Sequence, residues 1–126
     1  MSLLAAAVVA APGTAAAART ETVAPIKFGY LPKQIQKEAR RARADLGGPK
    51  VAMRAYMSPN HSAADKRLDP GGDLIIKSSA PIWIVTYKGK LKDEGESGTF
   101  AYETWSIRTG RALGRGFFPK GVPRGF

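Results

Sequence analysis

The sequence contains no cysteine and only one histidine. A disulfide framework, a thiol nucleophile and a cysteine-rich zinc site are therefore excluded, and one histidine is too few for a histidine-built metal centre. Acidic residues are also scarce, since ten Asp and Glu stand against twenty Lys and Arg, and the net charge is +10. The chain has 126 residues, 44% of them hydrophobic, which is enough for a core. We expect one folded domain with a basic surface and no cofactor.

The first eighteen residues carry no charged side chain, and Arg19 is the first cation. Leu3–Ala11 is apolar, Pro12-Gly13 interrupts it, and a run of alanines ends at Ala18. This order predicts a secretory signal peptide over residues 1–18, cleaved near Ala18, although the basic start of such signals is missing. The alternatives are an alanine-rich tail and an organellar transit peptide. The run is too short for a transmembrane span, which needs about 20 apolar residues. The prediction is a secreted or extracytoplasmic protein, and its Ala, Gly and Arg bias suggests a bacterial source.

One helix is predicted between Pro32 and Leu46. A proline suits the first turn of a helix, and Gly47-Gly48-Pro49 provides a stop. The apolar residues in this segment recur at helical spacing and form one stripe: Leu31, Ile35, Ala39, Ala42 and Leu46.

Strand-like segments follow. Val51–Met57 alternates, Ile82–Tyr87 is β-branched and aromatic, and Thr99–Ile107 is a further strand. In the second of these, Trp83, Val85 and Tyr87 share one face. The intervening segments are read as a polar loop (Ser58–Gly72), a short strand (Asp73–Ser78), a charged turn region (Gly89–Gly98) and a turn (Arg108–Arg111) leading to Ala112-Leu113.

The predicted fold is α+β, with one helix packed on a three- to five-stranded antiparallel sheet. The domain spans residues 31–113. An extended lead-in precedes it over residues 19–30. A basic tail rich in Gly and Pro follows over residues 114–126, and we expect it to lie on the surface or to be disordered.

Two segments together resemble the PepSY-like modules of secreted bacterial proteins. They are Pro81-Ile-Trp-Ile-Val-Thr-Tyr-Lys-Gly and Tyr102-Glu-Thr-Trp-Ser-Ile-Arg-Thr-Gly-Arg-Ala-Leu. In that family a tryptophan-bearing strand pairs with a strand that ends in Thr-Gly, and a preceding helix packs on the sheet. Arg108 stands where the family usually has an acidic residue. The resemblance covers residues 31–113 and implies a small extracytoplasmic module that binds or inhibits a partner and is not an enzyme.

Candidate catalytic residues are few. His61 could act as a base for Ser58 or Ser62, with Asp65 to orient it, but no nucleophile elbow is visible and a solvated loop histidine is the preferred interpretation. Asp93, Glu94 and Glu96 cluster without the spacing of a calcium loop and are read as a solvated hairpin tip. Glu103 is expected on the sheet surface, and Glu38 is expected to pair with Arg41 or Lys37.

The basic residues carry the binding hypothesis. Seven of them form the predicted site for an anion or a partner: Arg40, Arg41, Arg43, Lys88, Lys90, Arg111 and Arg115. Such patches bind phosphate backbones by counterion release, and aromatic residues such as Trp83 and Trp105 could add stacking, although both are expected in the core.

Three functions are weighed. The leading one is a secreted, non-enzymatic binding or inhibitory module whose partner is an unknown protein or an anionic envelope polymer. The alternative is an intracellular nucleic-acid-binding protein that uses the basic helix and tail. The third is a small hydrolase or lyase that uses His61.

Overall fold

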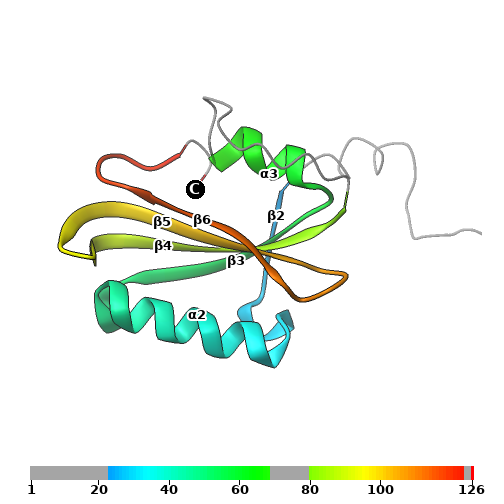
Figure 1. Ribbon diagram of the computed structural model, residues 1–126, viewed down its shortest axis with the longest axis horizontal. Helices are drawn as coiled ribbons and strands as arrows, with labels where there is room; N and C mark the ends of the chain where they lie inside the picture. Colours follow the sequence, from blue (N-terminus) through cyan, green and yellow to red (C-terminus); the bar gives the residue numbers. More distant parts are fainter. Residues whose placement is uncertain (1–22, 69–79, 124–125) are drawn as a thin grey trace, which may run out of the picture.

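The computed structural model describes residues 23–68, 80–123 and 126. They form a five-stranded antiparallel sheet in the order β2-β3-β4-β5-β6, with helix α2 (Lys33–Leu46) packed against one face (Figure 1). The strands are β2 (Ala24–Ile26), β3 (Ala52–Ser58), β4 (Ile82–Asp93), β5 (Glu96–Ser106) and β6 (Ala112–Phe118). The predicted α+β class is confirmed. No helix in these ranges is long and apolar enough to cross a membrane.

Helix α2 buries the stripe that its sequence spacing predicts. Leu31, Ile35, Ala39 and Leu46 are buried, and Ala42 is partly buried against the same cluster. Pro32 is the N-cap residue and Gly47 the C-cap residue, within one position of the predicted ends. A Cβ at Gly47 would lie 2.8 Å from Val51 Cγ2 and 2.9 Å from the Lys90 carbonyl oxygen, so only glycine lets the chain leave the helix here.

Strand β4 separates two cores, as its alternation predicts. Val85 and Tyr87 belong to the cluster under α2, and Trp83 packs against that cluster. Ile82 and Ile84 belong to the cluster on the opposite face. The strand is longer than predicted, because it continues past a bulge between Lys88 and Leu91 to a tight turn.

The charged segment Gly89–Gly98, predicted as a turn region, is mostly strand. Only Glu94 and Gly95 form the turn, with φ of 51° and 85°. Positive φ at both central residues is the geometry of the two-residue turn that joins twisted antiparallel strands. Leu91 is 1% exposed, and its burial explains why β4 continues through the otherwise polar segment that follows Gly89.

The predicted polar loop Ser58–Gly72 is wrong over its described part, because helix α3 (His61–Leu68) lies there on the second face of the sheet (Figure 1). The Ala63 amide donates a 2.7 Å hydrogen bond to Asn60 Oδ1, an arrangement typical of a helix start. Ala64 and Leu68, four residues apart, are each 1% exposed. The short strand predicted at Asp73–Ser78 lies outside the described residues.

The predicted division between the domain and a tail at residue 114 is also wrong. Strand β6 runs through it, pairing Glu103 with Arg115 and Tyr102 with Gly116. Gly116 fits in a strand because a Cβ there would lie 2.3 Å from the Tyr102 ring, which occupies that space. Farther on, the Phe126 ring packs 4.9 Å from the Tyr56 ring on the α3 face.

The predicted extended lead-in, residues 19–30, is ordered over its described part. Strand β2 pairs with β3 from Ala24↔Met57 to Ile26↔Ala55. A short 3-10 turn over Phe28–Tyr30 then leads into α2. The segment predicted as a signal peptide lies outside the described residues.

Candidate functional site

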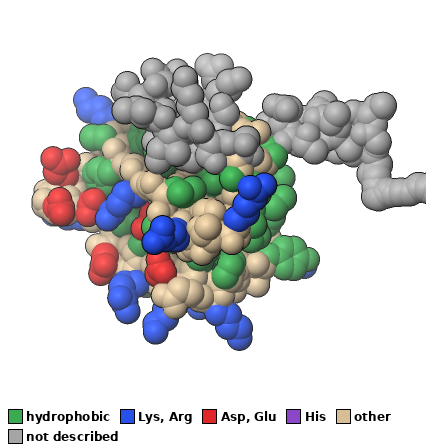
Figure 2. Space-filling view, turned by 45° about the vertical axis from the view of Figure 1, so that its right-hand side comes forward, with side chains coloured by type: hydrophobic (Ala, Val, Ile, Leu, Met, Phe, Trp, Pro, Cys, Tyr) green, Lys and Arg blue, Asp and Glu red, His purple; other side chains and the backbone are tan. Residues whose placement is uncertain are grey.

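The seven predicted anion-binding residues are distributed over three parts of the fold. Arg40, Arg41 and Arg43 lie on α2, Lys88 and Lys90 on β4, and Arg111 and Arg115 at and on β6. Figure 2 shows the blue side chains in separate places on the face in view, while the red ones gather towards its left side. The structure therefore does not bring these seven together as one patch on that face.

Two of the seven cations donate hydrogen bonds to backbone carbonyl oxygens. The Arg43 guanidinium donates 2.8 Å hydrogen bonds to the carbonyl oxygens of Val51 and Pro49, which fixes the chain as it leaves α2. The Lys88 ammonium donates to the carbonyl oxygen of Phe126 on the opposite face of the sheet. Both side chains satisfy backbone carbonyls, so both contribute to the fold.

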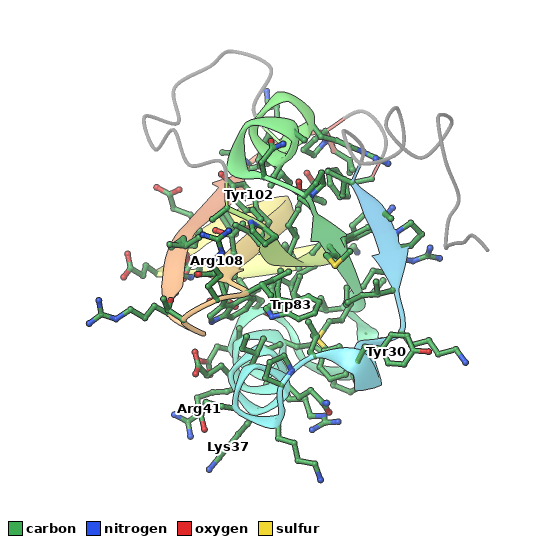
Figure 3. The ribbon with its side chains drawn as sticks, turned by 90° about the vertical axis from the view of Figure 1, so that its right-hand side faces the viewer. Tyr30, Lys37, Arg41, Trp83, Tyr102 and Arg108 are labelled. Atoms are coloured by element: carbon green, nitrogen blue, oxygen red, sulfur yellow. The ribbon has the colours of Figure 1, made fainter. Side chains whose placement is uncertain are left out.

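The other helix cations project from α2. Arg40 lies over the Phe28 ring, 5.2 Å from its centroid, and donates to Gln36 Oε1. Lys37 and Arg41 are exposed and extend from the side of α2 that faces away from the sheet (Figure 3). A cation at each of these positions keeps α2 soluble on its outer side.

The longest basic stretch lies along one edge of the sheet. Residues 104–126 contain five Lys and Arg and no Asp or Glu. Arg108 and Arg111 are exposed in the β5–β6 turn, Arg115 is exposed on β6, and Lys120 is exposed just after it. Because β6 is last in the strand order, these cations line an outer edge of the sheet. We call the strand with its flanking cations Arg108, Arg111, Arg115 and Lys120 the β6 edge.

The opposite edge of the sheet has a different character. Strand β2 has three residues, and one of them is Pro25, which has no N–H to donate. A short edge strand with a proline is a common way to prevent pairing with another chain. Strand β6 has seven residues and no proline, and no described strand pairs with its outer side.

A cluster of hydrogen-bonded polar side chains lies where α2 meets β4 and β5. The Tyr87 hydroxyl donates a 2.8 Å hydrogen bond to Glu103 Oε1, and the Trp105 indole N–H donates a 3.3 Å hydrogen bond to Glu38 Oε1. Gln34 also donates to Glu38, at 3.0 Å. The predicted ion pair of Glu38 with Arg41 or Lys37 is absent from the described contacts, because Glu38 turns towards the sheet.

The environment of Glu103 favours its neutral form. Burial raises the pKa of Glu103 above its ordinary value, and the nearby charge of Glu38 adds to this, while the Tyr87 hydrogen bond and the Arg115 charge act in the opposite direction. Burial and the Glu103 charge also raise the pKa of Tyr87, so its hydroxyl stays protonated and donates. Glu103 is therefore not the simple surface residue that the sequence predicts.

This group can link the helix to the sheet through hydrogen bonds. Two carboxylates, one phenol and one indole come from α2, β4 and β5. No three His, Asp or Glu side chains of the described ranges gather closely enough to hold a metal ion. No local sequence pattern predicts these contacts, because they depend on how β4 and β5 are paired.

The remaining candidates are placed as follows. Ser58 is fully buried, and its hydroxyl donates a 2.7 Å hydrogen bond to the Asn60 carbonyl oxygen. The side chains of His61, Ser62 and Asp65 lie outside the described part. Asp93, one of the three acidic residues predicted at the hairpin tip, forms an ion pair with Arg115, with 3.5 Å between the nitrogen and oxygen atoms.

Most aromatic side chains of β4 and β5 are core residues rather than an exposed stacking surface. Trp105, Tyr87 and Phe100 are 1% exposed or less, and Tyr102 is buried. Trp83 is partly buried between the sheet and α2 (Figure 3), and its indole N–H is buried without a partner among the described residues. The four buried rings are therefore not available for stacking with nucleic-acid bases, and Trp83 exposes only part of its ring.

Comparisons with protein families, curated proteins and solved structures gave no match for this chain. The candidate site therefore rests on its own geometry.

Proposed function

We propose that this protein is a secreted, non-enzymatic binding module whose partner contacts the β6 edge. The observation that carries the proposal is that the acid-free basic stretch of the chain coincides with the long edge strand β6, whose outer side pairs with no other described strand. A sheet edge offers unpaired backbone groups, and the cations beside it attract a partner of opposite charge.

The first eighteen residues support the secretion part of the proposal. They are uncharged, and their order of apolar run, Pro-Gly and small residues is typical of a cleaved signal. The resemblance to PepSY-like modules, which are extracytoplasmic, favours the same location. In that setting the partner is a protein or an anionic polymer of the cell envelope.

A binding role also agrees with the hydrogen bonds of the buried and partly buried polar side chains, which stabilise the fold. The Ser58 hydroxyl and the Arg43 guanidinium are both occupied with backbone carbonyls. Glu38 and Glu103 accept hydrogen bonds that join α2 to the sheet. The exposed groups that remain along the β6 edge are cations, whose chemistry is attraction rather than proton transfer.

Two measurements test the proposal. The first is the intact mass and N-terminal sequence of the protein from the medium and from the cells of its native host. A chain in the medium that begins at Arg19 supports secretion, whereas a full-length chain confined to cells contradicts it.

The second measurement is cosedimentation of the purified protein with washed envelopes of the same host at low and moderate salt. The double variant Arg111→Glu/Arg115→Glu should lose most of the bound fraction. The matched control Lys27→Glu/Arg54→Glu makes the same charge change on the β2–β3 side of the sheet. Equal loss in both variants would show that only net charge matters and would contradict a site on the β6 edge.

A further inference from the structure

We infer that the β6 edge binds an extended, acidic segment of a partner protein by adding it to the sheet as a sixth strand. The inference rests on the proposed function and deepens it, because it names both the chemistry of the partner and the way in which it binds.

The backbone of β6 supplies the pairing groups. In an antiparallel pair roughly every second residue directs its N–H and C=O away from its partner strand. Strand β6 pairs regularly with β5 from Phe100↔Phe118 to Thr104↔Gly114, and a bulge at Leu113 precedes the last pair, Trp105↔Ala112. The regular row of outer groups therefore covers residues 114–118, about 15 Å. An extended peptide added to such an edge gains main-chain hydrogen bonds along the whole row.

The charges select an acidic strand. Arg108 and Arg111 stand at the start of β6, Arg115 in its middle and Lys120 just beyond its end. The Arg115 side chain is 65% exposed although it contacts Asp93, so its guanidinium can meet a second carboxylate. A peptide lying along β6 therefore meets a cation at both ends and at its centre.

The same charges disfavour a second copy of this chain as the occupant. Pairing two β6 strands would bring two acid-free stretches together, and like charges across neighbouring strands are destabilising. The net charge of +10 adds a repulsion between whole molecules.

Nucleic acid fits this edge less well than a peptide does. The row of alternating N–H and C=O groups matches another peptide backbone, whereas a nucleic-acid strand needs phosphate contacts and stacking surfaces. Trp105, Tyr102 and Phe100 are buried, and Phe117 and Phe118 on β6 itself are partly buried, so no described ring of the sheet is fully exposed to a base. Among anionic macromolecules, the edge therefore favours an acidic polypeptide.

The test is fluorescence anisotropy of the full chain with labelled synthetic peptides of about nine residues, enough to span β6. The first peptide alternates threonine and glutamate. The second replaces glutamate with glutamine. The third keeps the glutamates but carries N-methyl groups on alternate backbone nitrogens, which removes the donors needed for strand pairing while the charge stays the same.

We expect the Thr/Glu peptide to bind at least about tenfold more tightly than either of the other two. The variant Arg111→Glu/Arg115→Glu should weaken this binding by a similar factor, and Lys27→Glu/Arg54→Glu should leave it within about twofold. Amide exchange of β6 should slow when the Thr/Glu peptide is bound.

Each contrary result separates the inference from the proposed function. Equal binding of the N-methylated peptide would overturn strand addition, while the electrostatic contact of the proposed function would stand. If no peptide binds but the protein still cosediments with envelopes, the inference of an acidic peptide partner would be wrong, and the proposed function would stand. Tighter binding of a labelled single-stranded oligonucleotide, lost in the Arg111→Glu/Arg115→Glu variant, would identify nucleic acid as the occupant instead.

Discussion

The Tyr87 hydroxyl on β4 donates a 2.8 Å hydrogen bond to the Glu103 carboxylate on β5. The two residues are diagonal neighbours, because Glu103 pairs with Val85 and Tyr87 pairs with Ala101. A phenol in the core thus reaches a carboxylate that lies beside α2, and the tyrosine hydroxyl also lies 3.4 Å from the Ala39 carbonyl oxygen of the helix. This contact connects the middle of the sheet with the middle of the helix.

Replacing Tyr87 with phenylalanine removes the donor and leaves Glu103 partly buried without it. We expect the free energy of unfolding to fall by about 1–3 kcal/mol, because an unsatisfied buried acceptor costs its desolvation. Urea unfolding followed by fluorescence measures the change. The control is Tyr30→Phe, since Tyr30 is 69% exposed, and it should leave stability unchanged. Equal stability of Tyr87→Phe and the unmodified protein would contradict a role for the hydrogen bond.

Glu103 should give the fold a distinct pH dependence. Its folded pKa is raised above the ordinary value of 4.5 by burial, so between the two pKa values the folded state binds more protons than the unfolded state. Its contribution to stability is therefore present at low pH and is lost as the pH rises through the folded pKa.

The variant Glu103→Gln removes this titration. We expect the stability of the unmodified protein to decline relative to Glu103→Gln as the pH rises from about 4 to 7. Comparing the two proteins cancels the other carboxylates, which titrate in both. A constant difference across this pH range would show that the folded pKa of Glu103 is not raised.

Gly116 and Gly114 offer a matched pair of substitutions on β6. A Cβ at Gly116 would lie 2.3 Å from the Tyr102 ring, whereas the nearest atom to one at Gly114 is Thr104 Oγ1 at 3.8 Å. We expect Gly116→Ala to lower stability by about 1–3 kcal/mol through displacement of the ring. Gly114→Ala should be neutral or slightly stabilising. Thermal unfolding of the two variants checks the difference, and the reverse order would contradict the packing of Tyr102 over Gly116.

Arg43 should matter for stability and Arg41 should not. The Arg43 side chain donates to the carbonyl oxygens of Val51 and Pro49, whereas Arg41 is exposed. We expect Arg43→Ala to cost about 1–3 kcal/mol, since it removes charge-assisted hydrogen bonds, and Arg41→Ala to change stability by less than about 0.5 kcal/mol. The two variants have the same charge, so a similar loss in both would assign the effect to charge alone.

The periodic parts of the fold could be predicted from the sequence. The stripe from Leu31 to Leu46 and the alternation from Ile82 to Tyr87 each mark a buried face, and the structure buries those faces. Helix α3 was missed because its described apolar anchors are only Ala64 and Leu68, within a polar segment. Strand β6 was missed because Gly114 and Gly116 have the composition of a loop, and only the neighbouring Tyr102 ring explains a glycine there.

The candidate site was predictable only in part. The number and sign of the charges could be read from the sequence, and they predict a binding surface with affinity for anions. Which cations share an edge depends on strand order, and that order follows from long-range pairing rather than from local composition. The Tyr87–Glu103 contact likewise needs the register of β4 and β5, which no local pattern specifies.

The sheet order β2-β3-β4-β5-β6 is also the order of the strands along the chain. Each strand can therefore be added to the one before it without threading, and the longest pair, β4 and β5, is joined by a two-residue turn. We expect this hairpin to assemble early and the outer strands to join late. We therefore expect the amides of the outer strands β2 and β6 to exchange before those of β4 and β5 in the native state, so the edge that we propose as the binding site would also open more often than the centre of the sheet.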